Sequence, residues 1–188
     1  LIPIQNKDWQ WSLSLNYSYN KNKIKKISNA LKEQNEQNQK KGGIVPLPIY
    51  EEGQSLTAIK VVPSAGIDPV TGNEIFIKRD GSYTMTYDAN DKVIFGDSTP
   101  FGIGSLSSYL TYKQFSLGTS FRYSFGGSIY NQTLATKVEG SDPRYNADER
   151  VFNDRWKQPG NIAKYKKISD SSVPQQTSRF LQTNNYIT

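Results

Sequence analysis

Residues 8–20 read DWQWSLSLNYSYN, and this stretch decides the fold. Every odd position carries an aromatic or aliphatic side chain: Trp9, Trp11, Leu13, Leu15, Tyr17 and Tyr19. The even positions from 10 to 18 carry only Gln, Ser and Asn. Side chains on a β-strand alternate between its two faces, so one face here is apolar and the other polar. The pattern predicts a strand over residues 9–20.

Two further segments repeat this alternation. Residues 115–127 read FSLGTSFRYSFGG, and residues 104–112 read GSLSSYLTY with Leu106, Leu110 and Tyr112 on one face. Only Lys113 and Gln114 separate the two segments, so they are predicted to form a hairpin.

The aromatic side chains gather near the strand ends, with leucines between them. Strands of about 11 residues have the length of tilted membrane-spanning strands. Aromatic girdles around an aliphatic band are typical of the lipid-facing surface of a membrane barrel, whose inner surface is polar. The predicted lipid-facing girdle consists of Trp9, Trp11, Tyr17, Tyr19, Phe115, Phe121, Tyr123 and Phe125. The predicted lumen-facing residues include Asn16 and Arg122, the latter either free or paired with a carboxylate of a neighbouring strand.

A soluble β-sandwich would show the same alternation, with the aromatic face turned into its core. The intervening segments favour the barrel. Residues 21–103 and 128–178 are unusually long connections for a compact domain, whereas membrane barrels combine short turns on one side with long extracellular loops on the other. We therefore predict an all-β, antiparallel fold that forms part of a large transmembrane barrel, and the sandwich stays as the alternative.

The long segments contain some predicted local structure. Residues 21–41 hold seven of the 23 basic residues of the chain, without an interleaved Arg or aromatic residue. They are interpreted as a solvated loop with a short helix near residues 28–39, and a nucleic-acid site is not indicated. Further on, a turn at residues 67–73 is flanked by apolar arms at 56–62 and 74–78, which predicts a hairpin projecting outside the membrane.

No enzymatic activity is expected. The chain has no His and no Cys, which excludes the usual catalytic triads, imidazole or thiolate metal sites and disulfides. The adjacent Glu51 and Glu52 point apart on an extended chain, so they do not form an acid–base pair. The candidate Ca²⁺ ligands, which lack the spacing of a calcium-binding loop, are Asp80, Asp88, Asn90 and Asp91.

Eight motifs resemble, in order, the barrel of the SusC/RagA-type TonB-dependent outer-membrane transporters of Bacteroidetes. They are W-x-W-S-x-S-x-N-Y-S-Y-N-K-N-K-I at 9–24, E-G-Q-S-L at 52–56, S-A-G-I-D-P-V-T-G-N-E-I-F at 64–76, G-D-S-T-P at 96–100, Y-K-Q-F-S-L at 112–117, F-G-G-S-I-Y-N at 125–131, R-W-K-Q-P-G at 155–160 and S-R-F-L-Q-T-N-N-Y at 178–186. The resemblance implies a place near the C-terminal strands of a barrel of about 22 strands. It also implies a further strand over residues 179–188.

The resemblance further implies a function and partners. Such a transporter imports oligosaccharides or peptides across the outer membrane of a Gram-negative bacterium, without a cofactor. Its partners would be the rest of its own barrel and the plug domain, which this chain lacks, a SusD-like lid lipoprotein, TonB through the missing N-terminal region, and outer-membrane lipid and lipopolysaccharide. In the loops, Trp156 with Arg155 is predicted either to contact substrate or to anchor its own loop. A sandwich-type carbohydrate-binding or adhesin module and a passive porin are the alternative functions.

Overall fold

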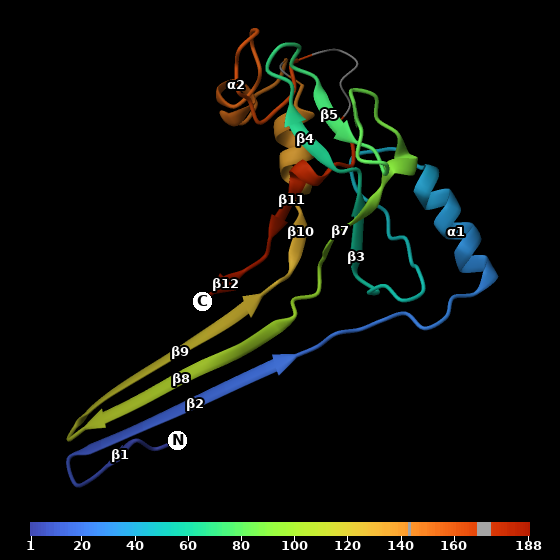
Figure 1. Ribbon diagram of the computed structural model, residues 1–188. Coiled ribbons are helices and arrows are strands. Elements are labelled where there is room, and N and C mark those ends of the chain that lie inside the picture. Colours follow the sequence, from blue (N-terminus) through green and yellow to red (C-terminus); the bar gives the residue numbers. More distant parts are fainter. Residues whose placement is uncertain (143, 169–173) are drawn as a thin grey trace.

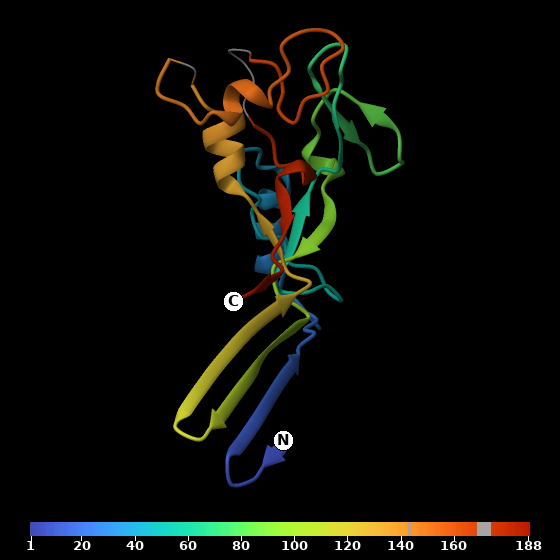
Figure 2. The ribbon, with the colours of Figure 1, turned by 90° about the vertical axis from the view of Figure 1, so that its left-hand side faces the viewer.

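The computed structural model describes residues 1–142, 144–168 and 174–188. Long strands project from one end of a wider region of short strands, helices and loops (Figures 1 and 2). We call the strands the wall sheet and the wider region the head. None of the described helices is long and apolar enough to cross a membrane.

The wall sheet is antiparallel, with the strand order β1-β2-β8-β9-β12. Its members are β1 (Ile4–Gln5), β2 (Trp9–Tyr19), β8 (Gly102–Tyr112), β9 (Phe115–Phe125) and β12 (Tyr186–Ile187). The three long strands pair along their whole lengths without a register shift, from Trp9 opposite Tyr112 to Tyr19 opposite Gly102. The turn between β8 and β9 is completed by Lys113 with φ 53°.

The register puts most of the apolar side chains of the three long strands on one face. Directly opposed residues of antiparallel strands share a face, so the odd positions of β2 and β9 join the even positions of β8. We call this the aromatic face. The side chains of Leu15 and Leu117, at its middle, are 72% and 62% exposed. In the part of the chain that the structure describes, this face is therefore open rather than buried as a core.

The head contains three small antiparallel sheets around a modest core. Their strands are β3 (Ala58–Val61) with β7 (Val93–Asp97), β4 (Ser64–Ile67) with β5 (Glu74–Ile77) and β6 (Tyr83–Thr84), and β10 (Ser128–Tyr130) with β11 (Leu181–Thr183). Its helical elements are α1 (Asn29–Lys40), η1 (Ala89–Asp91), the π-helical η2 (Leu134–Glu139), α2 (Arg150–Asn153) and η3 (Ser178–Phe180). The core consists of Ala135, Val138, Val151, Tyr165 and Phe180.

The predicted hairpin exists in the head, but its first arm was wrong. Residues 64–67, not 56–62, pair with β5, while residues 58–61 pair with the distant β7. The chain changes sheets at Pro63, which has no N–H to donate to a continuing ladder. The hairpin lies at the end of the head remote from the wall sheet (Figure 1), so it adds no strand to that sheet.

The strand predicted over residues 179–188 is also interrupted. The chain forms η3, then β11 against β10, and only then β12 against the end of β9. Asn185 breaks the alternation, because its Oδ1 accepts a hydrogen bond of 2.7 Å from the N–H of Gly126. Gly126 itself has φ +83°, and this ends the neighbouring strand at Phe125 rather than at residue 127.

Helix α1 begins as predicted but is docked rather than solvated. Its N-cap Ser28 accepts from the N–H of Leu31 at 3.3 Å. The buried Asn38 donates from Nδ2 to the carbonyl of Pro48 at 2.9 Å, and the fully buried Lys92 donates from Nζ to the carbonyl oxygens of Gln39 (3.2 Å) and Lys41 (3.1 Å). Burial lowers the pKa of Lys92. A lysine thus satisfies carbonyls that the helix C-terminus leaves open, where a cation is favoured.

Replacing Lys92 with alanine should release the C-terminal half of α1. The substitution removes the donor to two carbonyls and leaves a gap beneath the helix, which should lower the free energy of unfolding of this region by about 1–3 kcal/mol. Hydrogen exchange of residues 33–41 would accelerate accordingly. Lys40→Ala, at an exposed position of the same turn, is the control and should change exchange little. Equal rates in both variants would contradict the assigned role of Lys92.

Candidate functional site

Contacts made by aromatic side chains connect the long strands at both ends of the aromatic face. The rings of Trp9 and Tyr112 lie 4.1 Å apart between centroids. At the other end, the Tyr123 hydroxyl donates to the Asn16 carbonyl oxygen at 2.9 Å across β8. Tyr123 can cross β8 because Gly104 leaves room for it: a Cβ there would meet the Tyr123 hydroxyl and the Asn16 carbonyl.

The opposite face of the wall sheet is mostly small and polar. Ser107 and Ser120 lie 3.0 Å apart between their Oγ atoms, and the two faces differ as the alternation predicts. Asn16 and Arg122 both lie on this face, each opposite Ser105. None of the ion pairs between described residues involves Arg122. The exceptions to the pattern are Ile103 and Tyr109, which the sequence analysis did not place.

A buried ion network, which the sequence analysis missed, holds the head together. Arg179 of η3 donates from Nε and Nη2 to the two carboxylate oxygens of Glu74 at 2.8 Å each, and from Nη2 to both oxygens of Glu139 at 2.8 Å. The Nζ of Lys166 lies 3.6 Å from Glu139 and 4.0 Å from Glu74. Burial alone would lower the pKa of Arg179, but the hydrogen bonds to Glu74 and the charge of Glu139 raise it above its ordinary value.

Arg155 was predicted, with Trp156, either to contact substrate or to anchor their loop, and its contacts are those of an anchor. It is buried, and its guanidinium donates to four carbonyl oxygens at 2.8–3.0 Å. These oxygens belong to Val151, Lys166, Val138 and Glu139. The guanidinium thereby joins α2, η2 and the segment before residue 169, and its donors are committed to the loop.

Trp156 anchors its loop, the second of the two roles predicted for it. Its Nε1 donates to the carbonyl oxygen of Pro69 at 2.9 Å, and the Gly160 N–H donates to the same oxygen at 2.8 Å. Pro69 belongs to a turn that is closed by Asp68, which accepts a hydrogen bond from the Thr71 hydroxyl at 2.6 Å. That hydrogen bond, first among several, lowers the pKa of Asp68. The half-buried Trp156 ring also borders a shallow cleft of about 400 Å³.

Gly72→Ala should detach this loop from the turn. Gly72 has φ +70°, and a Cβ there would meet the Trp156 ring. We expect a loss of about 2 kcal/mol, from backbone strain and from displacement of the ring. Trp156 fluorescence and proteolysis within residues 156–168 would report it. Gly81→Ala is the matched control, because Gly81 has φ +84° but open space around it, so only the backbone cost of about 1 kcal/mol applies. Identical effects would contradict the steric argument.

The acidic residues considered for Ca²⁺ are engaged locally. Asp80 accepts from the Ser82 amide at 2.8 Å, Asp88 from the Asn90 amide at 2.8 Å, and Asp91 from the Arg79 amide at 3.2 Å. Within residues 1–142, 144–168 and 174–188, no three Asp or Glu residues form a group that could hold a metal ion. The structure therefore gives the Ca²⁺ hypothesis no support.

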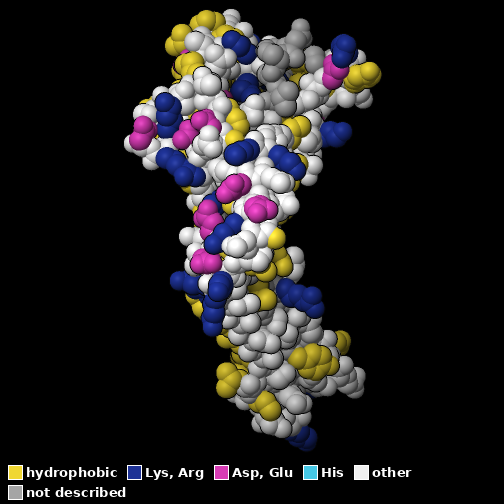
Figure 3. Space-filling model, turned by 90° about the vertical axis from the view of Figure 1, so that its right-hand side faces the viewer, with side chains coloured by type: hydrophobic (Ala, Val, Ile, Leu, Met, Phe, Trp, Pro, Cys, Tyr) yellow, Lys and Arg dark blue, Asp and Glu magenta, His cyan; other side chains and the backbone are white. Residues whose placement is uncertain are grey.

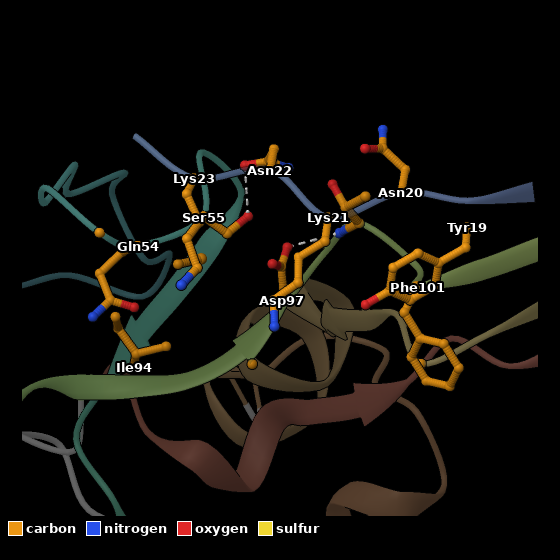
Figure 4. A pocket seen from close by; sticks show the side chains of 15 residues that line it. Tyr19, Asn20, Lys21, Asn22, Lys23, Gln54, Ser55, Ile94, Asp97 and Phe101 are labelled. Carbon is orange, nitrogen blue, oxygen red and sulfur yellow. Dashed lines mark hydrogen bonds between the residues drawn. The ribbon is translucent and has the colours of Figure 1, made fainter. Parts of the chain in front are cut away.

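A cleft of about 780 Å³ lies where the wall sheet meets the head, and we call it the junction cleft (Figure 4). Its lining includes Tyr19, Lys21, Lys23, Asp97 and Phe101. Asp97 Oδ1 accepts from the Thr57 hydroxyl at 2.5 Å and from the Thr99 amide at 3.0 Å. Burial tends to raise the pKa of Asp97, but these hydrogen bonds, led by that of Thr57, outweigh it and lower the pKa. Asp97 is therefore charged at neutral pH.

Comparisons with known proteins bear on this architecture. No protein-family model matches the chain. A solved structure described as the RagAB peptide transporter matches 99% of the chain with a TM-score of 0.77 and 24% identity, and two further structures, of the open-open and closed-closed states of the RagAB peptide importer, match with TM-scores of 0.75. A protein named TonB-dependent receptor P39, from Formosa agariphila, is 27% identical over 116 residues, or 62% of the chain.

The chain has the fold of the matching part of the solved RagAB chains, and its sequence is similar to that of a TonB-dependent receptor. It spans 20% of each of the solved RagAB chains and 11% of the Formosa protein. These matches confirm the resemblance of the motifs and the all-β class that the alternation predicts. Three of the motifs, those at 64–76, 155–160 and 178–186, have a structural role. They supply Glu74, Trp156 and Arg179, which connect segments of the head to one another.

Proposed function

We propose that this chain forms part of the barrel wall and the extracellular head of a TonB-dependent importer in the outer membrane of a Gram-negative bacterium. One observation carries the proposal. Three full-length strands pair without a break, expose a continuous apolar face, and end at an ordered polar head. A bilayer accepts such a sheet only as part of a closed barrel.

The arrangement supports an orientation across the membrane. The short turn at Lys113 and Gln114 lies at one end of the wall sheet and the head at the other (Figure 1). Charged side chains are sparse along the strands and frequent in the head and at its junction with them (Figure 3). We therefore place the aromatic face against lipid, the polar face with Asn16 and Arg122 towards the lumen, and the head outside the cell.

The proposed cargo is a peptide or an oligosaccharide. The solved RagAB structures are described as a peptide transporter or importer. The similarity of the chain to them favours a peptide over an oligosaccharide as the cargo. In the proposed assembly, the rest of the barrel and a plug close the pore, a SusD-like lipoprotein covers the head, and TonB supplies energy. This chain would contribute part of the barrel wall and of the extracellular loops to the transporter. Neither part requires a catalytic group.

Fractionation and uptake test this proposal. An antibody to residues 144–168 should detect an outer-membrane band much larger than 21.2 kDa that shifts on heating. A strain lacking the gene should lose growth on a peptide mixture, and loss of TonB should reproduce that defect. Uptake that persists without TonB would indicate a passive porin. A soluble band of the chain's own mass would overturn the membrane assignment.

A further inference from the structure

The three long strands of the wall sheet carry a single charged side chain. No charged residue lies in β2 or β8, and β9 contains only Arg122. The register places Arg122 on the polar face, in one row with Asn16 and Ser105. It is exposed, and none of the ion pairs between described residues involves it. Its guanidinium therefore keeps its donors for a ligand on an otherwise uncharged surface.

The polar face leads from Arg122 to the junction cleft. Asn20, Phe101 and Gly126 line the cleft, at positions that the register assigns to the polar face, whereas Tyr19 belongs to the aromatic face. The cleft thus extends across the rim of the wall. Gly126 lies four residues beyond Arg122, or about 13 Å along an extended strand. The single row of the polar face between them is uncharged and consists of Ser18, Ile103 and Ser124.

Two lysines enter the cleft from the segment that follows β2. Figure 4 shows the side chains of Lys21 and Lys23 extending from this segment towards Asp97. Between them, Asn22 Oδ1 accepts from the Leu56 amide at 2.8 Å, which fixes the segment to the head. Exposed and half-buried residues alternate from position 21 to position 25, as on an extended chain. The spacing of the two lysines is therefore set by an ordered backbone.

Positive charge is in excess in the cleft. The charged residues of its lining are Lys21, Lys23 and Asp97. Asp97 is engaged by the head, since its Oδ1 accepts hydrogen bonds from Thr57 and Thr99. None of the ion pairs in the described part of the chain involves either lysine. An anionic ligand is consequently favoured over a cationic one.

The spacing of these cations matches an extended peptide. Lys21 and Lys23 are two residues apart, or about 7 Å on an extended chain, and alternate side chains of a bound peptide have the same separation. Carboxylates at alternate positions can thus each meet one ammonium group through charge-assisted hydrogen bonds. The rings of Tyr19 and Phe101 offer an apolar surface to the neighbouring side chains. A longer peptide that follows the polar face reaches Arg122 with a further carboxylate.

We propose that Lys21, Lys23 and Arg122 form a cationic track that selects acidic peptides at the mouth of the lumen. The two lysines bind carboxylates at the rim, and Arg122 binds the next carboxylate further along the polar face. The inference rests on the proposed function, because the polar face is the path of a cargo only in such an importer. It narrows the cargo from peptides in general to peptides with acidic side chains.

The test uses the whole transporter, produced in cells that lack the chromosomal copy of its gene. One triple variant removes the track by the substitutions Lys21→Gln, Lys23→Gln and Arg122→Gln. The control triple variant removes the same charge from exposed positions outside the track by Lys25→Gln, Lys26→Gln and Arg144→Gln. The probes are three isotope-labelled heptapeptides of alanine with glutamate, glutamine or lysine at the second, fourth and sixth positions.

The parent should take up the glutamate peptide about tenfold faster than the glutamine peptide, and the lysine peptide most slowly. Salt should reduce this preference, because it screens the charges. In the track variant the preference should fall to about twofold or less, while uptake of the glutamine peptide stays at the parental rate. The control variant should keep the parental preference. Uptake of the glutamine peptide also shows, for each variant, that the barrel has assembled.

Three results would overturn the inference. Equal uptake of the glutamate and glutamine peptides by the parent would mean that the track selects nothing. An equal loss of preference in both triple variants would mean general attraction to a basic surface. Faster uptake of trigalacturonate than of the glutamate peptide would assign the track to acidic sugars. If all three peptides enter at one TonB-dependent rate, only this inference fails; if no peptide enters in a TonB-dependent way, the proposed function fails first.

Discussion

Replacing Arg179 with methionine should unfold the head while the wall sheet remains assembled. The substitution leaves Glu74 and Glu139 buried, and among the described residues the remaining salt-bridge partner of both is Lys166, at 3.6–4.0 Å. Removing one partner of a buried ion network costs about 3–5 kcal/mol, because the remaining charges stay desolvated. The head has a small core, so this is a large fraction of its stability. Protease added to intact cells should cut within residues 130–168, while the heat shift of the barrel is retained.

The control for this prediction is Arg144→Met. Arg144 forms a bidentate pair with Asp142 in an exposed turn, and its side chain is 82% exposed. Exposed pairs of this kind contribute about 0–1 kcal/mol, so the cleavage pattern should match that of the parent. If the head of the Arg179 variant resists the protease as the parent does, the ion network does not hold together the four segments that contain Glu74, Glu139, Lys166 and Arg179.

Leu15→Arg should prevent insertion of the barrel. Leu15 lies at the middle of β2 on the aromatic face, opposite Leu106, and its side chain is 72% exposed. In the proposed orientation it meets the centre of the bilayer, where an arginine on the lipid face of a barrel costs about 2–4 kcal/mol. The heat-shifted outer-membrane band should be strongly reduced.

Ser14→Arg is the neighbouring control. Ser14 lies on the opposite face, opposite Ser107, and faces the lumen in the proposed orientation. An arginine there can stay hydrated, so assembly should be close to that of the parent. If Ser14→Arg blocks assembly and Leu15→Arg does not, the two faces have been assigned the wrong way round. If both are tolerated, the strand does not cross a membrane.

Several features of the head were predictable from local sequence. The helix after Ser28 and the turn at residues 67–73 follow from a capping residue and from Asp, Pro and Gly in turn positions. The arms of the hairpin were not predictable in the same way. Residues 58–61 (AIKV) have the more strand-like composition, whereas residues 64–67 (SAGI) contain Ala and Gly, and only the pairing of the first segment with β7 makes the second the arm of the hairpin.

The ion network around Arg179 and the four carbonyl oxygens that surround Arg155 could not be predicted from the sequence. Glu74 and Arg179 are 105 residues apart, and each follows a polar residue and precedes an apolar one. Nothing local distinguishes them from Arg144 or Asp142, which are exposed. The two roles predicted for Arg155 with Trp156 stayed open for the same reason, because the residue type is visible in the sequence and its burial is not.

The sequence by itself determined the wall: an alternation of period two is a local property, and it assigns every side chain of β2 and β9 to a face before any contact is known. Only the tertiary structure decided the head. There, the choice of strand partners and the burial of Glu74, Glu139 and Arg179 depend on segments far apart in the chain. The sequence around a charged or hydrogen-bonding residue does not identify a partner that is distant in the chain. The role of such a residue is therefore visible only in the folded structure.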